Sequence, residues 1–242
     1  MKTMIEFEKM SKKERIDFAK CTCDPNVLRA LAEDAEMKVR KEVAENANTP
    51  SDVLDKLADD DKWLVKEAVA KNANTPADAL DRLVMYVNDY DDDDDDDYDD
   101  DDYDDYDDDD DYDDDDDDDD DDWACSVIKE AVAKNPNTST ETLSKLAVDE
   151  EVRWEIARNP KTSKIVLAML AVDEERDVRE AAAGNPNIPV EALWRIKEDI
   201  FQCVREAAAS NPSTPADLLL EFARDDSYLV REAAEKNPNF KR

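Results

Sequence analysis

A short phrase recurs through most of this chain and limits the folds that it can adopt. Its clearest copy is VREAAASNPSTPADLLLEFARDD, at residues 204–226. One asparagine marks the same point in each copy; these are Asn46, Asn72, Asn135, Asn159, Asn185, Asn211 and Asn237. Cys21 takes the equivalent place in the first copy, and the interval from Asn72 to Asn135 is much wider than the others. A period of about 25 residues is typical of stacked similar units, not of one globular core.

Each copy predicts two short helices. In the first, V-R-E-A-A-A-x-N, apolar residues recur at helical spacing, and the Asn-Pro or Asn-Ala that follows ends it. The second begins at Thr-Pro, as in Thr214-Pro215, where we expect the Thr to be the N-cap and the Pro to be the first helical residue. Leucines such as Leu54 and Leu57 then recur at i and i+3. Two such helices bury an apolar face only when units stack, so the sequence predicts an all-α solenoid of about seven units.

The motif V-R-x-x-[VA]-A-x-N-[PA]-x-T-P-x-x-x-L-x-x-L-A-x-D resembles the leucine-rich repeat variant family, over residues 14–88 and 123–242. The resemblance implies an α-helix and a short 3₁₀-like helix in each unit and a right-handed superhelix similar to HEAT and armadillo arrays. It would make V-R-E-A-A-A-x-N the 3₁₀-like element. Some members carry an iron–sulfur cluster on N-terminal cysteines. Here Cys21 and Cys23 have no second close pair, so we predict no cofactor. The resemblance implies a fold and no settled activity.

An acidic insertion interrupts the repeats at residues 89–122, which consist of 29 Asp and 5 Tyr. It carries −29 of the formal net charge of −36 and leaves about −7 for the rest. Like charges repel and no core can form, so we expect this acidic tract to be disordered. Three roles stay open: a solubilising spacer, a tract that attracts basic protein partners, and a weak binder of Ca²⁺-like cations. In the second role aromatic contacts would come from Tyr90, Tyr98, Tyr103, Tyr106 and Tyr112.

The sequence holds no recognisable catalytic or metal-binding motif. It has no His and a single Gly, which disfavours the common general base, zinc sites and phosphate loops. We therefore predict a non-enzymatic protein without catalytic residues or metal. Net acidity disfavours nucleic-acid binding, and no apolar run approaches a membrane span. Four cysteines without paired spacing indicate reduced thiols and a cytoplasmic location.

Two sets of residues are candidates for binding. A basic column would lie in register along the stack, either as an anion-binding ridge or as a ladder of internal ion pairs; it comprises Arg15, Arg40, Lys66, Lys129, Arg153, Arg179, Arg205 and Arg231. Trp154 and Trp194 stand where other units carry polar residues, and Phe201 lies in a nearby connector. These three aromatics are either local packing or an exposed patch for a protein partner.

Residues 1–13 are expected to cap the first unit, because terminal units of an array must shield an apolar face. The last residues, Pro238 to Arg242, follow a first helix without a second one. The sequence therefore predicts end-to-end self-association. The leading hypothesis for function is a repeat scaffold that binds another protein, with the acidic tract attracting basic partners. The alternative is a cation-binding or solubilising acidic protein that uses the solenoid as a platform.

Overall fold

The chain is an all-α solenoid. The computed structural model describes residues 9–91 and 121–241, with side chains at 9–87 and 123–241. In that part it contains fifteen α-helices, one 3₁₀ helix and no strand, which confirms the predicted fold class. The N-terminal lead-in up to residue 8 and the acidic tract from 92 to 120 lie outside the described residues, so the expected disorder of the tract stays a prediction.

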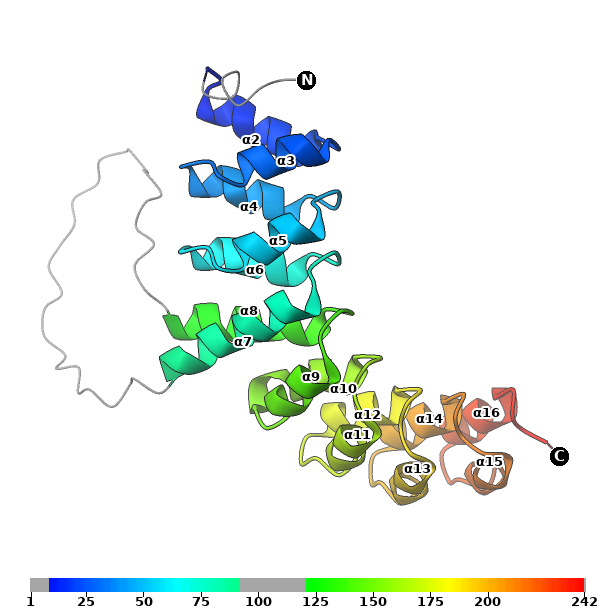
Figure 1. Cartoon of the computed structure of the whole chain (residues 1–242). Coiled ribbons are helices and arrows are strands. Elements are labelled where there is room, and N and C mark those ends of the chain that lie inside the picture. Colours follow the sequence, from blue (N-terminus) through cyan, green and yellow to red (C-terminus); the bar gives the residue numbers. More distant parts are fainter. Residues whose placement is uncertain (1–8, 92–120, 242) are drawn as a thin grey trace, which may run out of the picture.

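The helices form two layers (Figure 1). The inner layer is made of the V-R-E-A-A-A segments: α2 (Lys12–Cys21), α4 (Met37–Glu45), α6 (Trp63–Lys71), α8 (Asp121–Lys134), α10 (Arg153–Arg158), α12 (Arg176–Gly184), α14 (Gln202–Ser210) and α16 (Tyr228–Lys236). The outer layer is made of the leucine-containing segments: α3 (Pro25–Leu31), α5 (Ser51–Leu57), α7 (Ala77–Asp91), α9 (Thr140–Leu146), α11 (Lys164–Leu170), α13 (Val190–Ile196) and α15 (Ala216–Phe222).

Both layers are α-helical, which differs from the alternation of α and 3₁₀ helices that the family resemblance implied. The V-R-E-A-A-A segments are mostly nine-residue α-helices, such as α4, α12 and α14. The one 3₁₀ helix in the described residues is η1 (Glu150–Val152), directly before the six-residue α10. This unit is also the shortest, because the interval from Asn135 to Asn159 is smaller than any other between successive repeated asparagines.

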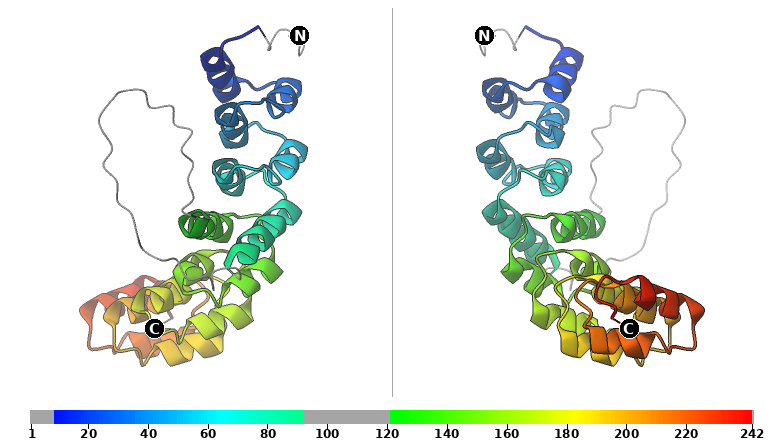
Figure 2. Two further views of the ribbon diagram at one scale, coloured as in Figure 1. Left: turned by 90° about the vertical axis from the view of Figure 1, so that its left-hand side faces the viewer. Right: turned by 90° about the vertical axis from the view of Figure 1, so that its right-hand side faces the viewer.

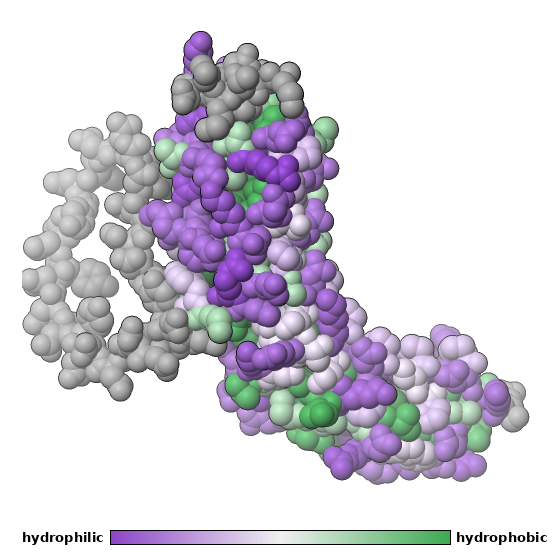
Figure 3. Space-filling view, in the orientation of Figure 1, coloured by the Kyte–Doolittle hydropathy of each residue, from purple (hydrophilic) through white to green (hydrophobic). Residues whose placement is uncertain are grey.

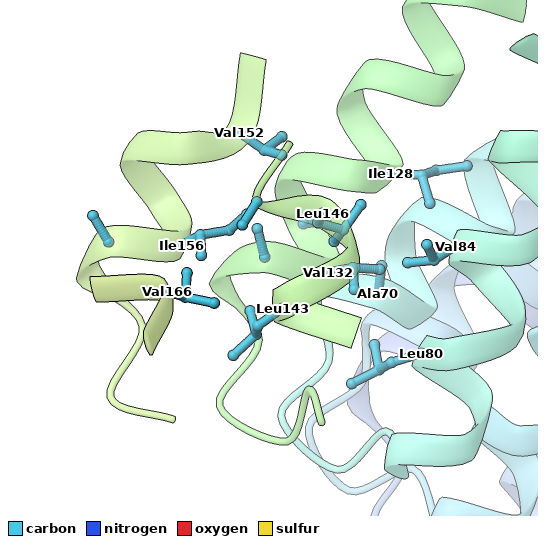
Figure 4. Packing of buried hydrophobic residues seen from close by; sticks show 14 of the residues in the cluster. Ala70, Leu80, Val84, Ile128, Val132, Leu143, Leu146, Val152, Ile156 and Val166 are labelled. Carbon is cyan, nitrogen blue, oxygen red and sulfur yellow. The ribbon is translucent and has the colours of Figure 1, made fainter. Parts of the chain in front are cut away.

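Small residues set the curvature of the stack. The inner helices bury mainly alanine with valine or isoleucine, as in Val204, Ala208 and Ala209 of α14, whereas the outer helices bury leucines. Because alanine allows close approach, the inner helices stack directly on one another and lie on the inside of the curve (Figure 2). The core runs unbroken past the acidic tract, from Ala70 and Leu80 through Ile128 to Val166 (Figure 4).

In the outer helices α5, α9, α11, α13 and α15 the N-cap is a proline or a serine, not the expected threonine. Pro50 and Pro215 are N-caps without a side-chain bond, while Ser163 accepts from the N–H of Val166. The preceding threonine is buried, and its hydroxyl donates back to a carbonyl of the inner helix, as Thr75 does to Val69 over 2.6 Å. The threonine therefore satisfies a helix C-terminus, where carbonyls lack partners.

The acidic tract is inserted between α7 and α8, and these helices are the longest of their layers. They pack side by side, and α7 ends at Asp91 and α8 begins at Asp121. The helices thus extend past the predicted boundaries at 88 and 123. Beyond this pair the stack bends, so that α2–α8 and α10–α16 form two arms (Figure 1).

Candidate functional site

The repeated asparagines hold neighbouring units together. Each ends an inner helix, and its amide nitrogen donates to at least two backbone carbonyls of the preceding unit. Asn185 donates to Ala157 O at 2.7 Å and to Asn159 O at 3.0 Å, and its Oδ1 accepts from the N–H of Asn187 at 2.9 Å. These side chains are buried and their hydrogen bonds are used internally, so they offer no amide to a ligand.

In the first unit the C-cap is Thr22, not the Cys21 that the spacing suggested. Its carbonyl accepts from the Asn46 amide at 2.9 Å.

Most of the basic column is used in ion pairs that join the inner helix of a unit to the end of the outer helix of the same unit. Each partner is the aspartate that lies just beyond the end of the next outer helix. The pairs are Arg15–Asp34, Arg40–Asp60, Lys129–Asp149, Arg153–Asp173, Arg179–Asp199 and Arg205–Asp225, at 2.6 to 3.2 Å. The cationic side chains in these pairs are only 10 to 17% exposed. Such placement favours the internal ladder over an anion-binding ridge.

The electrostatics of the ladder follow from these contacts. Burial alone would raise the pKa of the Asp60 carboxyl, but hydrogen bonds from Arg40 and from the backbone N–H of Lys62 hold it below its ordinary value. The Arg40 guanidinium, hydrogen-bonded to Asp60, has a raised pKa. A charge in such a pair would be left buried without compensation if its partner were removed.

The ladder is modified at three positions. Arg231 donates to the carbonyls of Asp225 and Asp226, at 2.6 and 2.8 Å. Lys66 has Tyr86 where other units have the aspartate: its Nζ lies 4.2 Å from the ring centroid and also donates to the carbonyl of Asp60. Burial lowers the pKa of the Lys66 ammonium. At the short unit, Arg153 keeps Asp173, but its Nε and Nη2 atoms have no hydrogen-bond partner among the described residues.

The candidate aromatics do not form one patch. Trp154 lies on the inner helix α10, Trp194 on the outer helix α13, and Phe201 is the N-cap of α14. All three are partly exposed, at 37, 38 and 40%. The tyrosines Tyr98, Tyr103, Tyr106 and Tyr112 lie outside the described residues.

Trp154 borders a groove on the inner layer of the C-terminal arm. The groove has a volume of about 770 Å³ and runs over α10, α12 and α14; its lining includes Trp154, Arg158, Glu175, Asp177, Glu180 and Gly184. The Arg158 guanidinium lies over the Trp154 ring, 4.6 Å from its centroid. An aromatic face beside several carboxylates suits an organic cation.

A second surface that sequence reasoning missed lies on the outer layer of the same arm. Ile165 and Met169 of α11 are 84 and 46% exposed. The equivalents of Ile165 in five of the other outer helices are acidic: Asp52, Asp78, Glu141, Glu191 and Asp217. Those of Met169 include Lys56, Arg82, Lys145 and Arg195.

More apolar side chains are exposed close by in sequence, including Val148 and Val172. Apolar surface is correspondingly more frequent over the C-terminal arm than over the N-terminal one (Figure 3). A comparison of the second and sixth residues of each outer helix would have revealed Ile165 and Met169.

The structure offers no metal centre within the part that it describes: residues 9–87 and 123–241 contain no group of three or more His, Cys, Asp or Glu able to hold an ion. The four cysteines are free thiols. Burial, followed by the neighbouring Glu180 carboxylate, raises the pKa of the Cys203 thiol. None of the described helices is both long and apolar enough to cross a bilayer.

Stacked helix pairs joined by a buried asparagine ladder define a helical-repeat solenoid, and the comparisons name its type. The leucine rich repeat variant family matches one unit, residues 204–227. The fold is similar to a solved structure described as a leucine-rich repeat variant with a novel repetitive structural motif, with a TM-score of 0.54 and 19% identity over 96% of this chain and 79% of that one. The predicted resemblance to leucine-rich repeat variant proteins is therefore confirmed.

Two other solved structures are more distant. An engineered protein has a TM-score of 0.41 at 16% identity over 96% of this chain and 75% of its own. A designed armadillo repeat protein has a TM-score of 0.28 at 13% identity over 96% of this chain and 95% of its own. At these TM-scores neither supports an argument. No curated protein matches the chain.

Proposed function

We propose that this protein is a non-enzymatic scaffold that binds another protein through the C-terminal arm, α10–α16. The observation that carries the proposal is the replacement of charged residues by exposed Ile165 and Met169 on the outer layer. When a partner removes exposed apolar side chains from water, the complex is stabilised by about 25 cal/mol for each Å² of apolar surface buried. Ile165 is 84% exposed, so packing within the chain accounts for little of its surface and a partner explains its position better.

The acidic tract adds attraction for basic partners in this proposal. Its 29 aspartates create a field that acts over about 8 Å at physiological salt and steers association more than it adds affinity. Binding of Ca²⁺-like cations by the tract is the alternative, because carboxylate oxygens are the ligands that this ion prefers. Cytoplasmic location and end-to-end self-association stay predictions.

The test is a pair of substitutions that restores the charges of the other units, Ile165→Asp with Met169→Lys. Because Ile165 is 84% and Met169 46% exposed, the variant should differ from the wild type by less than about 1 kcal/mol in its free energy of unfolding. Proteins captured by the wild-type chain should no longer be captured by the variant. The proposal is wrong if both chains capture the same proteins in the same amounts at every salt concentration.

A salt series separates the tract from the apolar surface. Partners held by the tract should dissociate as salt rises, whereas partners held by Ile165 and Met169 should stay bound. Calorimetric titration with Ca²⁺, on the full chain and on a chain lacking 92–120, tests the alternative. Equal heats from the two chains would exclude the tract as the cation site.

A further inference from the structure

The inner layer carries a repeated ion pair along one face. The fifth and ninth residues of a nine-residue inner helix stand at i and i+4 and are therefore neighbours on its surface. They have opposite charges in α4 and α16, where Lys41–Glu45 and Glu232–Lys236 are 3.0 and 2.7 Å apart. The same pairing joins Glu67 to Lys71 in α6 and Glu130 to Lys134 in α8. In α10 a cation–aromatic pair, Arg158 over Trp154, takes its place.

In two adjacent inner helices, α12 and α14, this repeated pair keeps its carboxylate but has no cation. The fifth and ninth residues are Glu180 and Gly184 in α12, and Glu206 and Ser210 in α14. Among the described residues neither Glu180 nor Glu206 forms a close ion pair, although the Glu180 carboxylate is hydrogen-bonded to the Cys203 thiol and lies near Arg176. Two negative charges thus stand side by side along the stack, without the cations that neutralise them elsewhere.

Gly184 has no explanation in the packing of the chain. It is the single glycine of the protein and stands at the last residue of α12. A Cβ built on it would meet no atom within 4 Å, so a larger side chain fits there. Glycine in a helix costs about 1 kcal/mol relative to alanine. The residue is therefore unfavourable for the helix and leaves space beside Glu180.

The effect on the surface is a wider groove. Between α6 and α8, where Lys71 and Lys134 are present, the equivalent inner groove has a volume of about 260 Å³. Over α10–α14 it has about 770 Å³. Three carboxylates line this larger groove, those of Glu175, Asp177 and Glu180. Asp177 is paired with Arg176 at 2.6 Å, and Arg158 is the cation of the lining.

We propose that the groove binds a protein segment whose cationic side chains replace the two missing ones. One occupies the space over Gly184, between Trp154 and the Glu180 carboxylate, and the next reaches Glu206 beside Ser210. This inference rests on the proposed scaffold function and names the chemistry of one partner. The amphipathic stem of an arginine or lysine packs on the tryptophan while its charged group meets the carboxylate.

The stack also sets the spacing of the two cations. Packed helices lie about 8–10 Å apart, so we expect Glu206 of α14, just beyond the groove lining, to lie about that far from Glu180 along the stack. A polyproline II segment has three residues per turn and rises about 3.1 Å per residue. Residues three apart then lie on one face, about 9 Å from one another. The geometry favours a ligand of the form Arg-x-x-Arg in this conformation.

The test uses a proline dodecapeptide with arginine at every third position, titrated calorimetrically into the full chain at about 0.15 M salt. The key variant is Gly184→Lys, which restores the residue type found at this position in α6, α8 and α16. We expect the peptide to bind the variant at least about tenfold more weakly than the wild type, since one charge-assisted contact is lost. The same variant should be at least as stable as the wild type, so unfolding cannot explain the loss.

Ser144→Lys is the matched control, because it adds the same charge to an exposed position of α9 on the outer layer. It should leave the affinity unchanged. A peptide with glutamate in place of arginine should not bind. The acidic tract is present in every chain, so its contribution cancels in these comparisons.

Equal affinity of wild type and Gly184→Lys, with binding that disappears at high salt, would overturn the groove proposal and leave the scaffold function with its acidic tract intact. The proposal would also be overturned if Gly184→Lys and Ser144→Lys weakened peptide binding to the same extent, because the loss would then come from the added net charge. Absence of peptide binding to every chain would refute the groove. The Ile165→Asp, Met169→Lys experiment would then decide the scaffold function independently.

Discussion

The asparagine ladder makes a sharp prediction about stability. Replacement of Asn185 by alanine removes three hydrogen bonds at once: two donated to carbonyls of the preceding unit and one accepted from the N–H of Asn187. The site is only 3% exposed, so water cannot readily replace the lost partners. At about 1 kcal/mol net for each bond, the substitution should lower the free energy of unfolding by about 3 kcal/mol.

The matched control is Asn187→Ala in the same turn. Asn187 donates one exposed hydrogen bond, to Pro160 O at 2.5 Å, and water can satisfy that carbonyl after the substitution. Its loss should cost about 0.5 kcal/mol. Both residues follow the same helix, so the comparison separates the buried bonds between units from the conformational preference of asparagine in a turn.

Urea unfolding followed by circular dichroism measures the difference, with amide hydrogen exchange to locate it. Because each unit of a solenoid contacts only its neighbours, Asn185→Ala should increase exchange first in α10, α12 and α14, and less in α4 and α6. The reasoning is refuted if Asn185→Ala and Asn187→Ala shift the unfolding midpoint equally, or if exchange rises uniformly along the chain.

The basic column supports two further predictions. Lys66→Met should change the free energy of unfolding by less than about 1 kcal/mol, because no described carboxylate depends on this buried amine, whereas Lys129→Met should cost about 2 kcal/mol by leaving the Asp149 carboxylate without its partner. Equal losses of stability for Lys66→Met and Lys129→Met, measured by thermal unfolding, would contradict this reasoning. The pKa of the Asp225 carboxyl is lowered: burial would raise it, but the hydrogen bonds from Arg205 and a backbone N–H outweigh burial. The stability that this carboxylate contributes is therefore present above the unfolded pKa of about 3.9 and is lost as pH falls through the lower folded value. Asp225→Asn should thus be clearly less stable than the wild type at pH 7 and approach it in stability at about pH 2, and a difference independent of pH would contradict the assignment.

The period of the phrase and the helical spacing of its apolar residues determined the solenoid by themselves. A unit with two short amphipathic helices has no other way to bury valines and leucines than against the next unit. The position of the insertion also followed from sequence, since 29 aspartates cannot enter a core. Local rules were less reliable at the caps: threonine in Thr-Pro resembles an N-cap, but its hydroxyl bonds to the preceding helix instead.

Only the tertiary structure decided which residues far apart in the sequence meet. The aspartate that pairs with each cation lies most of a unit further along the chain, and stacking brings the end of the next outer helix beside the cation. Stacking likewise separated Trp154 from Trp194 into different layers. The role of Gly184 also becomes visible only when neighbouring helices are stacked. The glycine opens space beside the carboxylate of Glu180, in a row of charges that exists only when the units are placed side by side.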